Sequence, residues 1–207
     1  LGCTSPLGPV AGIVDAERVG TDITPYWQRK DRPVYAEAPT VPNVCRNLIN
    51  RVYMHRNLWI SDPDVHIARI DNNELTENEI RLWTAALWMV GGLTLLCDRF
   101  ESLAPERAEL SKLLLRRTDA FDGVRPLDFR ESAVPSVWFG RFAETGAPVY
   151  GFFNFGETPR TFSVRHDGPD WNFVEYWSKA AVEAEGGLLE AAVPPHSCRI
   201  LFGGAAQ

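Results

Sequence analysis

The hydrophobic pattern of this chain changes its period near residue 117, and this change constrains the fold more than any other feature. Before residue 117, short apolar runs alternate with segments whose apolar residues recur every three or four positions, which is typical of βα units around a parallel sheet. After it, aromatic and β-branched residues alternate with polar ones between Gly, Pro and Asp turns. We therefore expect an α/β domain over residues 1–117 and an antiparallel β-sandwich domain over residues 118–207.

Individual elements follow from the same periods. In the α/β domain we expect strands over residues 11–20, 57–62 and 93–98 and a helix over residues 42–55. Thr76 and Glu79 have the spacing of a capping box ahead of a second helix, and Pro105 suits the first turn of a third. In the β domain we expect strands over residues 136–142, 148–155, 160–166, 171–177 and 197–202, the last with Cys198, Ile200 and Phe202 on one face.

The α/β domain is too short for a complete (β/α)8 barrel. It offers three or four βα units, whereas a barrel has eight and about 250 residues. Half of a barrel would leave two sheet edges unpaired. The chain also begins with Leu1 in place of methionine. We therefore expect the C-terminal half of a TIM barrel, whose other half lies upstream in a longer protein.

Composition excludes several classes of partner. The net charge is −6 and the basic residues are dispersed, so we expect no nucleic-acid partner. No apolar run approaches the roughly 20 residues that span a bilayer, so we expect no membrane insertion. The four cysteines lack C-x-x-C spacing and the four histidines share no ligand spacing, so we expect neither a metal site nor a disulfide scaffold.

Four carboxylates follow the ends of predicted strands: Asp22, Asp62, Asp64 and Asp98. In a parallel α/β fold such positions converge on one rim, where active sites are built. In the sequence "SDPD", an extended backbone would point the side chains of Asp62 and Asp64 to the same side. The structural alternative is that these aspartates cap helices or close turns by accepting backbone N–H groups.

Arg18 lies four residues before Asp22, and Tyr26 and Trp27 follow closely. An aromatic wall beside a carboxylate and a guanidinium is suited to binding a sugar, because the ring stacks on apolar faces while its hydroxyls meet the charges. The alternative is an exposed i, i+4 ion pair of little energetic value.

These motifs resemble those of a known enzyme family. The run "LGCTSPLGPVAGIVDAERVGTDITPYW" is similar to the pattern "GCGSPLxPxxGxVDGxRIGPDxxPxW" of the melibiase-type α-galactosidases, glycoside hydrolase family 36, whose retaining clan includes family 27. Residues 51–69 resemble the family's "R-x-x-x-H…W-x-N-D-P-D" segment, residues 91–103 its final barrel strand, and residues 193–202 the last strand of its C-terminal β domain. The resemblance spans nearly the whole chain.

The resemblance implies roles for individual residues. Asp22 corresponds to the acid/base, Arg18 to the arginine that precedes it in the pocket, and Asp64 to a pocket carboxylate after the seventh strand. Cys3 corresponds to a residue beside the sugar, and the family nucleophile would lie upstream of Leu1. The expected site thus has Asp22 as catalytic residue and the substrate-binding residues Cys3, Thr4, Arg18, Trp27, Asp62 and Asp64. Its chemistry needs no cofactor, because two carboxylates suffice.

The mechanism sets further expectations for Asp22. An acid/base must be protonated when substrate binds, so its pKa should be raised by burial and by the nucleophile's charge. A direct pair with Arg18 would oppose this, so we expect Arg18 to contact a substrate hydroxyl or to orient the site. Without the nucleophile we expect the 207-residue chain to be inactive.

The sequence leaves alternatives open for both the substrate and the class of function. Thr4 replaces a family Gly, Ser61 an Asn, and Val65 and His66 an apolar or sulfur-containing pair, so an α-N-acetylgalactosaminide or a pentopyranoside remains an alternative to a terminal α-galactoside. A second hypothesis is a non-catalytic carbohydrate-binding or assembly protein with a degenerate half-barrel, using Trp138, Trp171 or Trp177 of its β-sandwich. Family members are often oligomeric, so self-association belongs to the expectation.

Overall fold

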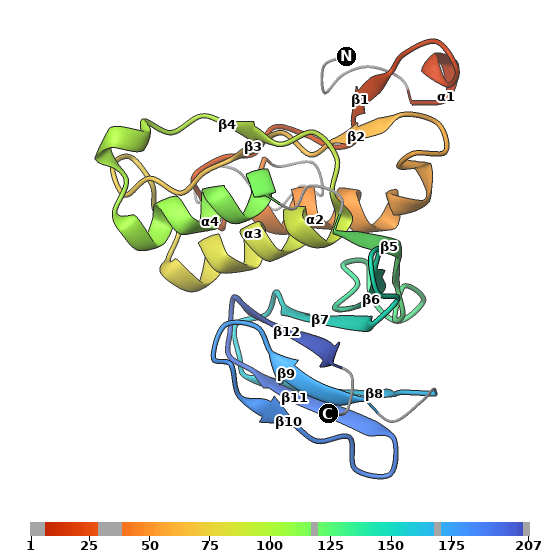
Figure 1. The fold of residues 1–207 in the computed structure, drawn as a ribbon. Coiled ribbons are helices and arrows are strands. Elements are labelled where there is room, and N and C mark those ends of the chain that lie inside the picture. The colour runs from red at the N-terminus through yellow and green to blue at the C-terminus, as the bar shows by residue number, and fades with distance from the viewer. Residues whose placement is uncertain (1–6, 29–38, 117–119, 168–170, 205–207) are drawn as a thin grey trace. The chain divides into compact units, whose positions relative to one another are not determined.

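The computed structural model of the protein describes residues 7–28, 39–116, 120–167 and 171–204. The chain forms two compact units, Leu1–Ala120 and Phe121–Gln207 (Figure 1). The first unit mixes helices with short parallel strands, and the second is built of antiparallel strands.

The first unit contains two pairs of short parallel strands. Strand β1 (Ala16–Arg18) pairs with β2 (Ile60–Asp62), and β3 (Val65–His66) pairs with β4 (Leu95–Leu96). The remaining elements are α1 (Leu7–Val10), α2 (Val41–Asn50), η1 (Val52–Met54), α3 (Glu77–Val90), η2 (Phe100–Ser102) and α4 (Pro105–Arg116). Helices α2, α3 and α4 lie side by side on one side of the strands (Figure 1).

The two predicted helix starts with a specific capping feature are confirmed. The Thr76 hydroxyl accepts a hydrogen bond from the Glu79 N–H at 3.3 Å, and the Glu79 carboxylate accepts one from the Thr76 N–H at 2.6 Å, which completes the capping box of α3. Helix α4 begins at Pro105, whose missing N–H costs nothing in a first turn.

Several predicted elements are shorter than expected, among them the strands over residues 57–62 and 93–98, which are reduced to β2 and β4. The strand expected over residues 11–20 is reduced to β1, because Gly12 has a φ of 76° and residues 11–13 form a turn. The helix expected over residues 42–55 begins at Val41 and ends at Asn50. The 3-10 turn η1 follows, and the His55 ring then accepts a hydrogen bond from the Ser61 N–H at 3.1 Å, which links this segment to β2.

His66 connects β3 to two helices. Its Nε2 lies 2.9 Å from Thr84 Oγ1 on α3, and its Nδ1 lies 3.2 Å from Ser111 Oγ on α4. The Thr84 hydroxyl proton is used by the Ile80 carbonyl at 2.8 Å, so Thr84 must accept from Nε2–H and Ser111 must donate to Nδ1. The neutral imidazole therefore satisfies both hydroxyls in a fully buried position.

The second unit contains a six-stranded antiparallel sheet with the strand order β10-β9-β12-β7-β6-β5, and strands β11 and β8 form a second sheet. The strands are β5 (Phe121–Pro126), β6 (Val137–Phe142), β7 (Pro148–Asn154), β8 (Arg160–Arg165), β9 (Asn172–Glu175), β10 (Ala181–Val182), β11 (Leu188–Val193) and β12 (Ser197–Gly204). The five expected strands are all present as β6, β7, β8, β9 and β12, whereas β5, β10 and β11 were not predicted.

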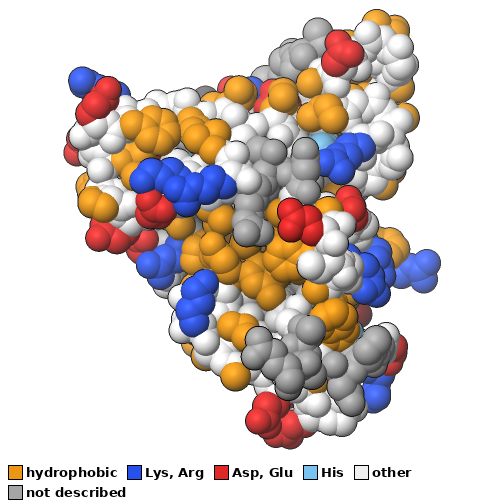
Figure 2. Space-filling model, in the orientation of Figure 1, with side chains coloured by type: hydrophobic (Ala, Val, Ile, Leu, Met, Phe, Trp, Pro, Cys, Tyr) orange, Lys and Arg blue, Asp and Glu red, His pale blue; other side chains and the backbone are white. Residues whose placement is uncertain are grey.

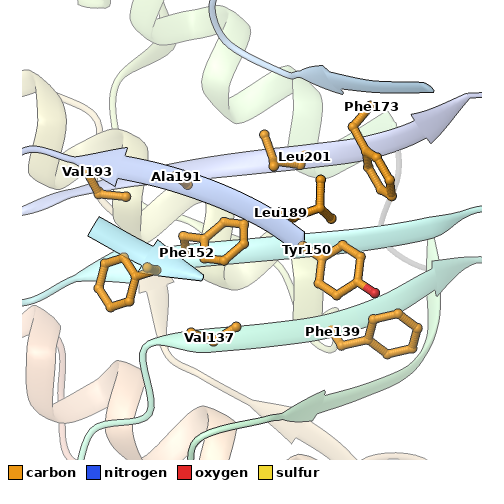
Figure 3. Packing of buried hydrophobic residues seen from close by; sticks show 10 residues of the cluster. Val137, Phe139, Tyr150, Phe152, Phe173, Leu189, Ala191, Val193 and Leu201 are labelled. Atoms are coloured by element: carbon orange, nitrogen blue, oxygen red, sulfur yellow. The ribbon is translucent and has the colours of Figure 1, made fainter. Parts of the chain in front are cut away.

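One hydrophobic cluster is shared by the two sheets of the second unit (Figure 3). Phe139, Tyr150 and Phe152 of the large sheet contribute to the same buried cluster as Leu189 and Val193 of β11. Side chains from two sheets that meet in one core define a β-sandwich. Trp138 is also buried, and its indole N–H donates to the Pro135 carbonyl at 2.8 Å, so it occupies a core position and cannot serve the glycan-binding alternative.

The surface shows charges of both signs. On the face drawn in Figure 2, Lys and Arg side chains lie interspersed with Asp and Glu. Within the described ranges, no helix has the length and apolar character needed to cross a bilayer.

Residue 92 must be glycine, because the backbone there passes close to Ser61 of β2. Its φ is 107°, and a Cβ atom added there would overlap the carbonyl oxygen of Ser61, which accepts a hydrogen bond from the Leu93 N–H at 3.0 Å. Gly12 has a similar need for positive φ, but a Cβ there would meet nothing within 4 Å. A side chain at residue 12 would therefore suffer only from the backbone conformation, whereas one at residue 92 would also overlap the Ser61 carbonyl oxygen.

We predict that Gly92→Ala lowers the free energy of unfolding by more than about 2 kcal/mol, since it combines backbone strain with a steric overlap. The matched variant Gly12→Ala should lose only about 1 kcal/mol, because it suffers the strain alone. Urea denaturation of both variants measures the difference. If both variants lost the same free energy of unfolding, the close contact with the Ser61 carbonyl oxygen would not be the reason that residue 92 must be glycine.

We also predict a pH dependence from His66. Burial lowers the pKa of His66 to about 4 from an ordinary value of 6.5, with the Asp98 charge acting in the opposite direction. Between these values the unfolded chain binds the proton more readily, so the stability from neutral His66 is full above pH 6.5 and is lost as the pH falls toward 4. The loss is about 3 kcal/mol.

Comparison with His66→Gln isolates this contribution from other titrating groups. The wild-type protein should exceed the variant in unfolding free energy at pH 7, and the gap should narrow by pH 4.5. A gap that stays constant over this range would contradict the assignment.

Candidate active site

Strands β1 and β2 bring Arg18 and Asp62 side by side. They pair in parallel with Arg18 opposite Asp62, and the next residue, Val19, donates its N–H to the Asp62 carbonyl at 3.0 Å. Arg51, which caps the end of α2, donates from its guanidinium to the Val19 carbonyl. The carboxyl ends of β1 and β2 therefore lie next to each other, and the candidate site is at these ends.

The segment after β2 is a turn and is not extended at Asp64. Asp64 has a φ of 78°, and its N–H donates to Asp62 Oδ1 at 2.8 Å. The condition under which an extended backbone would align the two side chains is therefore not met at Asp64. Their proximity arises from a turn in which Asp62 accepts a backbone hydrogen bond, and this is the structural role named as the alternative.

The guanidinium of Arg18 contacts all three aspartates. Its Nη1 lies 3.0 Å from Asp22 Oδ1, its Nε 3.3 Å from Asp62 Oδ2, and its Nη2 3.1 Å from Asp64 Oδ1. Three of the four aspartates expected to converge, Asp22, Asp62 and Asp64, are thus brought together by Arg18. The expectation that Arg18 avoids a direct pair with Asp22 is wrong, because the planar guanidinium presents donors on three sides.

Burial divides the three carboxylates. The side chains of Asp62 and Asp64 are 13% and 11% exposed, and that of Arg18 is 15% exposed. Both oxygens of Asp64 are engaged, since Oδ2 accepts from the Ile23 N–H at 2.7 Å. Asp22 is 65% exposed, and within the described part of the chain its Oδ2 has no partner. Asp22 is therefore the carboxylate of this cluster that can meet a ligand.

The charges of the cluster are coupled. Burial raises the pKa of Asp64, and the charges of Asp22 and Asp62 act in the same direction, against the Ile23 N–H and Arg18. Burial lowers the pKa of Arg18, but the negative charges of Asp64 and Asp62 raise it by more than burial lowers it. The pKa of Arg18 is therefore raised overall. Arg18 stays charged, and Asp64 accepts a proton more readily than an ordinary aspartate.

The burial expected for Asp22 is absent. Asp22 lies in the loop after β1 with most of its side chain in solvent, and among the described residues its side chain pairs with Arg18.

The other predicted site residues are placed differently. Cys3 and Thr4 lie outside the described residues, and Trp27 is half-buried. Asp98 contacts other residues: it accepts hydrogen bonds from the Ala68 and Arg69 N–H groups and pairs with the Arg69 guanidinium at 3.1 Å. Asp98 therefore fixes the loop after β3.

The chain is similar in fold to several solved structures whose names are those of glycosidases. α-Galactosidase I from Mortierella vinacea has a TM-score of 0.73, is 14% identical, and matches 96% of this chain and 55% of its own. A family 27 β-L-arabinopyranosidase from Geobacillus stearothermophilus, in complex with arabinose, has a TM-score of 0.68 at 15% identity and matches 93% of this chain and 46% of its own. The α-galactosidase from Saccharomyces cerevisiae with raffinose has a TM-score of 0.65 at 13% identity and matches 92% of this chain and 59% of its own.

These matches establish a likeness of fold. The resemblance we named was to family 36, and the structural likeness includes family 27 of the same clan. No protein-family model matches the chain. The chain spans about half the length of the structures it matches, with shares of 55%, 46% and 59%.

We predict that Arg18→Met lowers the free energy of unfolding by about 3 kcal/mol, because it leaves the carboxylates of Asp62 and Asp64 unpaired and largely buried. In the double variant Arg18→Met/Asp64→Asn the loss should be at least about 1 kcal/mol smaller than the sum of the single losses. The matched control is Arg81→Met. Arg81 pairs with Glu77 at 3.5 Å on the exposed side of α3, so its loss should be about 0.5 kcal/mol or less. Additive losses in the double variant would contradict the coupling.

Proposed function

We propose that this chain is the C-terminal segment of a retaining glycoside hydrolase that cleaves terminal α-galactosides, and that Asp22 is its acid/base. The observation that carries the proposal is the exposed carboxylate of Asp22, held by Arg18 at the carboxyl ends of two parallel strands. Such strand ends are where α/β enzymes build their active sites. The fold likeness to two α-galactosidases over 96% and 92% of the chain supports the substrate class.

In a retaining mechanism one carboxylate attacks the anomeric carbon and a second carboxyl, about 5 to 5.5 Å away, protonates the leaving oxygen. Asp22 gives its proton to that oxygen in the first step and takes a proton from the attacking water in the second. Arg18 holds one oxygen of Asp22 through Nη1, which leaves the other oxygen for the proton transfers. The nucleophile is supplied by a part of the gene product outside these 207 residues.

In this proposal residues 1–117 form the last part of a (β/α)8 catalytic barrel and residues 118–207 a β-sandwich domain. One face of the short strands supports it. Ile60 on β2 and Leu95 on β4 are 36% and 42% exposed, whereas the residues next to them on these strands, Ser61 and Leu96, are buried and half-buried. Parallel strands are normally covered on both faces, so further chain is expected to pack against Ile60 and Leu95.

The remaining substrate contacts are assigned by the family resemblance. Cys3, Thr4 and Trp27 line the sugar. Asp62 and Asp64 are assigned to the substrate as well; both pair with Arg18 in this structure, so they support the site by holding Arg18 beside Asp22. Two carboxylates suffice for the chemistry, so the site needs neither a metal nor an organic cofactor. A second substrate candidate is a β-L-arabinopyranoside, since one matched enzyme is a β-L-arabinopyranosidase, and this sugar has the galacto arrangement of ring hydroxyls without the C6 group.

We predict that Asp22→Asn in the full-length gene product lowers kcat/KM for melibiose by about 10²- to 10⁴-fold, because the poor leaving group needs a proton. An aryl α-galactoside with a nitrophenol leaving group should lose less in the first step, because nitrophenolate departs without protonation. Added azide should restore turnover of the aryl substrate by replacing the water that Asp22 activates. Measured rates with both substrates, with and without azide, test these points.

The control variant is Asp71→Asn, which changes an exposed aspartate in a turn of the same unit. It should leave both rates unchanged. An equal loss on both substrates without rescue by azide would remove Asp22 from the acid/base role. The 207-residue chain alone should have no turnover, and measurable hydrolysis by it would contradict the assignment of the nucleophile to another segment.

A further inference from the structure

The second unit has a pocket of about 540 Å³ at one edge of its hydrophobic cluster. It is lined by residues from the end of β8, from β9 and β10, and from the turn that leads into β11, among them His166, Trp171, Asn172, Phe173, Val182 and Glu183. Its volume lies in the range of roughly 300 to 1,000 Å³ that is typical of small-molecule sites.

Trp171 is seated against strand β12. A Cβ atom added to Gly203 would lie 2.8 Å from Pro148 and 3.3 Å from the Trp171 indole, so only glycine lets the indole rest on the backbone at this position. Trp171 is half-buried and packs on the cluster that contains Phe173. The indole is therefore held in place while part of it faces the pocket.

His166 forms a rigid wall of the same pocket. Its Nδ1 lies 2.9 Å from the Tyr150 hydroxyl, and its ring meets Phe173 edge-on with centroids 5.3 Å apart. Asn172 and Glu183, by contrast, are exposed. The pocket thus combines aromatic surfaces near the core with an amide and a carboxylate toward solvent.

These groups select the class of ligand. Among the described residues that line the pocket there is no Lys or Arg, and the Glu183 carboxylate repels anions, so phosphorylated and carboxylated ligands are disfavoured. A carboxylate accepts hydrogen bonds only, so the ligand must offer O–H or N–H groups. A neutral molecule with a flat apolar face for the indole and hydroxyls for Asn172 and Glu183 meets both conditions.

We propose that this pocket is a saccharide-binding site, separate from the Asp22 site and carried by the other unit of the chain. A hexose ring stacks on Trp171, and its hydroxyls bind Asn172 and Glu183. This is a function additional to the proposed hydrolysis, because the pocket binds a sugar and does not cleave it.

The experiment is a titration of the ¹⁵N-labelled 207-residue protein with melibiose and, separately, with raffinose, at millimolar concentrations. The indole N–H signal of Trp171 should shift in a saturable way, with a Kd of about 1 mM. Trp171→Ala should weaken binding at least about tenfold and Trp171→Phe less, because a phenyl ring still stacks. The matched control is Trp177→Ala, a half-buried tryptophan of the same unit that does not line the pocket, and it should bind as the wild type does.

Asp22→Asn separates this site from the proposed active site. If the Trp171 signal still shifts in that variant, the sugar binds in the second unit whatever the outcome of the hydrolysis assays. No saturable shift of the Trp171 signal with either sugar would overturn the proposal, as would equal weakening by Trp171→Ala and Trp177→Ala. A shift caused by tetramethylammonium but by neither sugar would identify a cation site and would also overturn it.

Discussion

The three ion pairs of Arg18 determine the arrangement of the candidate site. One guanidinium joins the loop after β1 to the turn after β2 by contacting Asp22, Asp62 and Asp64 at 3.0 to 3.3 Å. Two of these carboxylates are largely buried, and buried charges persist only when they are paired and hydrogen-bonded. The position of Arg18 on β1, opposite Asp62 on β2, makes this pairing possible.

The fold was predictable where one local pattern and one tertiary environment agree. Helix α3 follows from a capping box and an apolar stripe, and strands β6 and β7 follow from their aromatic and β-branched residues. Strand β11 was missed although its burial alternates, because the run "LLEAAV" has few strand-forming residues. Its strand conformation comes from pairing with β8, which is a tertiary effect.

The candidate site was predictable in its residue types but not in its geometry. The positions of Asp22, Asp62 and Asp64 after strands pointed to one rim, and there the three are found together. The positive φ of Asp64 and the hydrogen bond from the Ile23 N–H carry no sequence signal, since each depends on how two distant loops meet. Asp98 has the same local context as the other three, yet it serves the loop at Arg69.

The unequal burial of the three aspartates has a consequence for how the site responds to a change of charge. Asp62 and Asp64 hold Nε and Nη2 of Arg18, so the guanidinium is anchored on two sides that Asp22 does not share. A change of charge at Asp22 therefore alters the surface of the site while these two anchors stay in place. The geometry of the guanidinium is fixed by the two buried carboxylates, and the exposed one can vary without dismantling it.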